Sequence, residues 1–116
     1  MTGVQTCALP ISSPTYPAWD LAIPDQRRAD AWLAELAAFV EQGQMPALEV
    51  LHLPNDHTSG AKPGMPTPRA YMADNDLALG RIVEGLSHSP FWKDTRSKST
   101  RLNSSHRSLS RMPSSA

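Results

Sequence analysis

The sequence predicts an α/β fold in the order helix, strand, loop, helix. Two segments carry apolar residues at helical spacing, and a short apolar segment that ends at a proline lies between them. Because helices that alternate with strands are typical of layered sheet proteins, α/β is the expected fold class. With 116 residues, of which 40% are hydrophobic, the chain is long enough for one domain with a modest core.

The first helix is expected over residues 24–42. Pro24 suits a first helical position, and Asp25 lies near the positive end of the helix dipole. Gly43 supplies a stop. The apolar face follows the i, i+3, i+4, i+7 rule and comprises Ala29, Trp32, Leu33, Leu36 and Val40. This face is expected to pack onto a sheet.

A buried strand is expected over residues 47–53, which are largely apolar and are followed by Pro54. The loop 54–66 then gathers polar side chains, starting with Asn55, Asp56 and His57. In open α/β sheets, ligands bind at the carboxyl ends of strands. One strand cannot form a sheet, so the sequence indicates an excised piece of a larger α/β domain.

The second helix is expected to start with Thr67 as N-cap and Pro68 as first helical residue, and to end at Ser89 and Pro90. Its apolar face comprises Leu79, Ile82, Val83 and Leu86. The acidic and amide residues 74–76 fall within this helix and are expected on a polar face.

Composition excludes several classes of protein. A single cysteine, Cys7, rules out an internal disulfide and a cysteine-based zinc finger. No run approaches the roughly 20 apolar residues that a membrane helix needs, so no membrane partner is expected. Residues 1–95 hold 6 Lys/Arg and all 11 Asp/Glu, whereas residues 96–116 hold 5 Lys/Arg and no acid.

The basic segment 96–116 contains 8 serines and almost no apolar residues, which is typical of disorder. If it is genuinely encoded, it could bind nucleic-acid phosphates without sequence preference. However, residues 2–11 and most of 98–116 match translations of a common short-read sequencing adapter, in opposite strand senses. Residues 1–11 and 96–116 are therefore interpreted as adapter-derived and non-native, and Cys7 and His106 then carry no biological meaning.

The insert 12–95 resembles a known family. The motifs are Leu-Pro-Asn-Asp-His-Thr-Ser-Gly at 53–60, Pro-Thr-Pro-Arg-Ala at 66–70, Ala-Asp-Asn-Asp-Leu-Ala-Leu-Gly-Arg-Ile-Val-Glu at 73–84 and Ser-His-Ser-Pro-Phe-Trp-Lys-Asp-Thr at 87–95. Together they resemble the phosphoesterase family of the alkaline phosphatase superfamily, in its bacterial form that is often fused to a β-propeller. The insert would then be a partial phosphoesterase domain.

The resemblance implies an α/β/α sandwich hydrolase that cleaves phosphate esters with divalent metals, usually a zinc pair, and a Thr or Ser nucleophile. It also implies an exported bacterial parent, periplasmic or secreted. Asp56 is the first metal-ligand candidate and His57 the second, because relatives often space these ligands Asp-x-x-x-His and the residue four after Asp56 is Gly60.

No catalytic residue is assigned in this chain. The family's nucleophile segment lies upstream of residue 12, and its acidic strand with a following His motif comes after Thr95; neither is present. A hydrolase without its nucleophile cannot turn over, so the fragment is expected to be inactive and to bind no metal stably. The alternative is a small non-catalytic protein whose basic tail binds nucleic acid.

Overall fold

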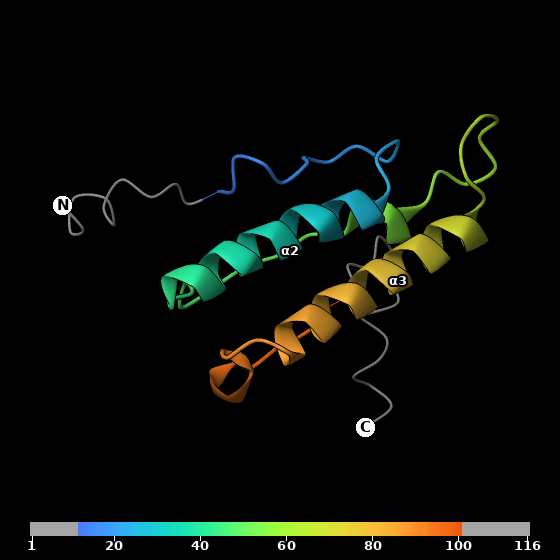
Figure 1. Cartoon of the computed structure of the whole chain (residues 1–116). Coiled ribbons are helices and arrows are strands. Elements are labelled where there is room, and N and C mark those ends of the chain that lie inside the picture. Colours follow the sequence, from blue (N-terminus) through green and yellow to red (C-terminus); the bar gives the residue numbers. More distant parts are fainter. Residues whose placement is uncertain (1–11, 101–116) are drawn as a thin grey trace, which may run out of the picture.

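The computed structural model describes residues 12–100. They form two long helices, α2 (Asp25–Gln42) and α3 (Pro68–Ser87), and two short 3-10 helices, η1 (Pro54–His57) and η2 (Trp92–Asp94). The long helices lie side by side and run in the same direction, and residues 44–53 return in extended form between the end of α2 and η1 (Figure 1). The adapter-like segment 1–11 and most of the segment 96–116 lie outside the described residues.

Helix α2 confirms the predicted helix 24–42, except that Pro24, predicted as its first helical residue, is its N-cap. It starts after Pro24, whose extended backbone (φ −61°, ψ 144°) forms the N-cap without a side-chain hydrogen bond. It ends at Gly43, which adopts the left-handed conformation (φ 75°) that glycine reaches without steric strain. The backbone N–H of Gly43 donates to the carbonyls of the last helical turn.

Helix α3 begins as its sequence predicts. The Thr67 hydroxyl accepts a hydrogen bond from the backbone N–H of Ala70 at 3.2 Å, and Pro68 occupies the first turn, where a missing N–H has no cost. The helix ends at Ser87, with His88 as its C-cap. Ser89 N–H then donates to the Leu86 carbonyl at 3.0 Å and turns the chain away.

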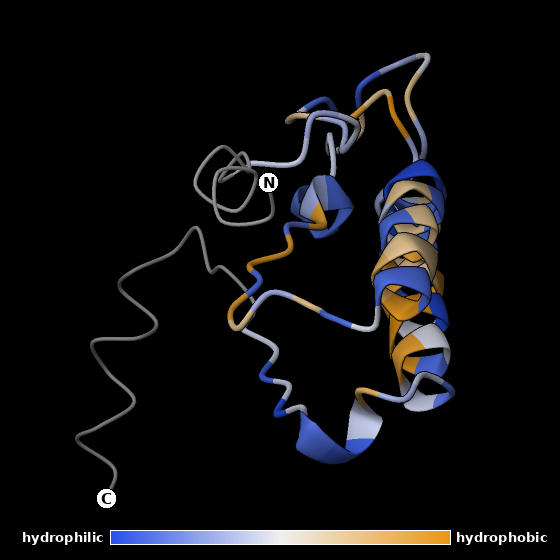
Figure 2. Cartoon of the chain, turned by 60° about the vertical axis from the view of Figure 1, so that its left-hand side comes forward, coloured by the Kyte–Doolittle hydropathy of each residue, from blue (hydrophilic) through white to orange (hydrophobic). Residues whose placement is uncertain are grey.

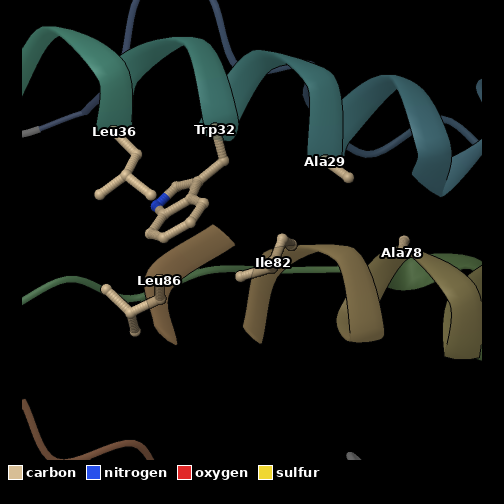
Figure 3. Close-up of a cluster of buried hydrophobic side chains, with 6 residues drawn as sticks. All are labelled: Ala29, Trp32, Leu36, Ala78, Ile82 and Leu86. Atoms are coloured by element: carbon tan, nitrogen blue, oxygen red, sulfur yellow. The ribbon is translucent and has the colours of Figure 1, made fainter. Parts of the chain in front are cut away.

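The core lies between the two long helices. Side chains from both facing surfaces interdigitate there (Figure 3), namely Ala29, Trp32, Leu36, Ala78, Ile82 and Leu86. Gly85 lies against the side chain of Leu33, where an added Cβ would collide with the Leu33 methyl group. The prediction that the apolar face of α2 packs onto a sheet is therefore wrong: among the described residues this face packs onto α3.

The predicted strand 47–53 is wrong, and with it the prediction of an α/β/α sandwich fragment. Residues 44–53 have extended backbone, yet no strand is assigned anywhere within residues 12–100. The side chains still alternate: Glu49, Leu51 and Leu53 are half-buried, whereas Leu48 and Val50 are 80% and 88% exposed. A strand requires a second strand to pair its backbone groups, and the described chain places none beside this segment.

The described chain thus has two layers. Both helices lie on one side of the extended segment 44–53. The apolar part of this segment runs beside the helix pair (Figure 2). Leu51, Leu53 and Met45 pack against the core from this second layer. After η2, residues 95–100 run back in extended form, in the same direction as residues 44–53 (Figures 1 and 2).

Candidate functional site

A buried polar cluster joins the start of α2, the N-terminal half of α3 and η1. Asp25 and Arg28 are fully buried and Asn55 is 1% exposed. Asp25 Oδ1 accepts a hydrogen bond from Arg28 at 3.2 Å, and Asp25 Oδ2 accepts one from the backbone N–H of Asn55 at 3.1 Å. Asp25 therefore ties η1 to the first turn of α2.

Two residues of α3 complete the cluster. The Asp74 carboxylate accepts hydrogen bonds from the backbone N–H of Asp25 at 2.6 Å and from the Asn55 side-chain amide at 2.8 Å. The Asn75 amide donates to Asp25 Oδ2 at 2.9 Å and to the Leu53 carbonyl at 3.0 Å. The expected polar helix face is thus wrong for Asp74 and Asn75, which point into the cluster, and right for exposed Asp76.

Arg28 connects the cluster to the preceding segment. Its guanidinium donates to the carbonyls of Ala18 at 2.6 Å, Asp20 at 3.1 Å and Ile23 at 2.9 Å. Buried Arg28 Nε and Asn55 Oδ1 have no hydrogen-bond partner among the described residues. Burial raises the pKa of Asp25 above its ordinary value, against the hydrogen bonds from Asn75 and Asn55 and the positive charge of Arg28.

The predicted metal ligands, Asp56 and His57, both belong to η1 at the end of the extended segment. Asp56 is half-buried and His57 is exposed. The His57 ring lies 5.3 Å from the Trp19 ring in an edge-on arrangement, and Trp19 also contacts His52 at 5.4 Å. His57 Nδ1 is 2.9 Å from the Thr58 carbonyl oxygen.

Carboxylate and imidazole groups are common zinc ligands, but a protein zinc site has three or four ligands. Within residues 12–100 no group of three or more His, Cys, Asp or Glu side chains is placed to hold a metal ion. The described residues therefore hold no complete metal site around Asp56 and His57.

An open hollow of about 1690 Å³ lies beside Asp56 and His57. Its walls are the extended segment, one face of α3 with Leu79, Ile82 and Val83, and the returning residues 94–100. Small-molecule pockets usually measure about 300–1,000 Å³. The hollow is larger than such a pocket. Its walls include the extended segment 44–53 and residues 95–100, which run in the same direction (Figure 1).

No helix within the described range is both long and apolar enough to span a membrane. The basic residues Arg96 and Lys98 are described and exposed. The rest of the predicted nucleic-acid-binding tail, from residue 101 onward, lies outside the described residues.

Comparison with protein-family models, with curated proteins and with solved structures finds no match. The resemblance to the phosphoesterase family therefore depends on the sequence motifs alone.

The buried polar cluster was missed at the sequence level, although a signal for Asp74 and Asn75 exists. Asp74 lies four residues before Ala78, and Asn75 lies four residues before Leu79, so both extend the apolar face of α3 toward its start. No comparable local pattern marks Asn55, because it is buried by contacts with residues 19 and 30 positions away.

Proposed function

We propose that this chain is a piece of a metal-dependent phosphoesterase, inactive by itself, in which Asp56 and His57 belong to the metal site of the complete enzyme. The observation that carries the proposal is the position of these two residues. They lie together in η1, at the C-terminal end of an extended segment that lies against two helices (Figure 2), and both line the open hollow beside it.

The unpaired extended segment supports the idea of a fragment. Leu48 and Val50 are largely exposed, although large apolar side chains are more often buried. In the complete protein, further residues would cover these side chains.

The chemistry assigned to the chain itself is limited to binding. In the complete enzyme a divalent metal would polarise the phosphoryl oxygens of a phosphate ester. Asp56 would offer a carboxylate oxygen and His57 its Nε2 atom, while the buried cluster fixes η1 through Asn55. The motifs assign no nucleophile to this chain, so phosphate ester cleavage requires residues beyond it.

Inactivity is tested with the full 116-residue chain, p-nitrophenyl phosphate and bis-p-nitrophenyl phosphate, with added zinc chloride. We expect no hydrolysis above the zinc-only background. Hydrolysis that copurifies with the chain and is removed by chelation would contradict the assignment as an inactive fragment.

Metal ligation is tested in the complete protein encoded at the source locus. The Asp56→Ala variant is expected to lose bound zinc, measured by elemental analysis, together with phosphatase activity. Asp76→Ala is the matched control, because Asp76 is an exposed aspartate on α3. Full zinc content in the Asp56→Ala protein would contradict the role of Asp56.

A further inference from the structure

We draw no further inference here: the strongest candidate, the open hollow between the extended segment 44–53, one face of α3 and residues 94–100, with the exposed side chains of Leu48 and Val50 in its wall, carries nothing, because no contact or charge pattern among the described residues shows what covers it.

Discussion

The carboxylate of Asp74 on α3 caps the first turn of α2 at Asp25. It accepts hydrogen bonds from the backbone N–H of Asp25 at 2.6 Å and from the backbone N–H of Gln26 at 3.4 Å. The first N–H groups of a helix have no partner within the helix, and Pro24 at the N-cap offers no side-chain hydrogen bond. One helix therefore supplies the cap of the other, which couples the two helices at their N-terminal ends.

Replacing Asp74 with alanine should lower the free energy of unfolding by about 2–3 kcal/mol. The change removes a helix cap, which contributes about 0.5–2 kcal/mol, and leaves the buried Asn55 amide without this acceptor. Urea denaturation followed by circular dichroism measures the effect. Asp76→Ala, at an exposed position of the same helix, should change stability by less than about 0.5 kcal/mol. Equal effects of the two substitutions would disprove the capping role.

Asp25 should make stability depend on pH in a defined direction. Burial raises its pKa above the ordinary value of 3.8, so the folded chain keeps this proton to a higher pH than the unfolded chain. The contribution of Asp25 to the free energy of unfolding is therefore complete below about pH 3.8 and declines as pH rises through the folded-state pKa.

The measurement compares urea denaturation of the unsubstituted chain and of Asp25→Asn at several pH values from about 3.5 to 6.5. The difference in unfolding free energy, unsubstituted minus variant, should fall as pH rises. A difference that increases with pH would show that the carboxylate, and not the carboxylic acid, is favoured by the fold.

The hydroxyl of Tyr16 should lose its proton only at a pH well above the ordinary pKa of tyrosine. Burial is the main cause that raises its pKa to about 12, from an ordinary value of 10.0. Its hydroxyl donates to the His52 carbonyl at 2.7 Å, which holds the segment before α2 against the extended segment. In a Tyr71→Phe background Tyr16 is the remaining tyrosine, so phenolate absorbance reports on it directly.

We expect a midpoint near pH 12 for Tyr16, and loss of its stabilising contribution between about pH 10 and pH 12. At neutral pH, Tyr16→Phe should lower the free energy of unfolding by about 1 kcal/mol, the usual contribution of one hydrogen bond. A midpoint near pH 10 in the folded chain would show that the Tyr16 ring is solvated.

The two glycines inside α3 should respond differently to alanine. Gly80 has open space where a Cβ would stand, so Gly80→Ala should stabilise the chain by about 0.5–1 kcal/mol through helix propensity alone. Gly85→Ala gains the same propensity but forces the Leu33 side chain to move. It should be less stabilising than Gly80→Ala, or destabilising. Thermal denaturation of the two variants checks the difference, and a larger gain at Gly85 would contradict the close packing of α2 on α3.

Local signals were sufficient for the helices. The Thr67 cap, the Gly43 stop and the apolar spacing of both helices depend on residues within a few positions of one another, and the structure confirms them. The strand could not be predicted in the same way. The pattern of residues 47–53 favours extended backbone, which the structure has, but pairing requires a neighbouring strand that no local pattern guarantees.

For the candidate site, too, the sequence predicted some features and not others. Asp56 and His57 stay predictions, which depend on the resemblance to the phosphoesterase family and on their place after an apolar segment that ends at a proline. No local pattern indicates the contacts that fix the neighbouring Asn55, since Asp25 and Asp74 reach it across 30 and 19 positions of sequence. Thr58 has a positive φ of 61°, which the sequence does not predict either, because threonine is not a residue that favours positive φ.

The most direct test of the central claim is to sequence the source locus across both ends of the insert, with primers inside residues 12–95. If the chain is a piece of a metal-dependent phosphoesterase, the reading frame continues past Thr95 into an acidic segment and a His-containing motif, with a Thr or Ser nucleophile segment upstream. If the genome instead encodes residues 1–11 and 96–116 as they stand, the phosphoesterase fragment is refuted and the small protein with a basic tail takes its place.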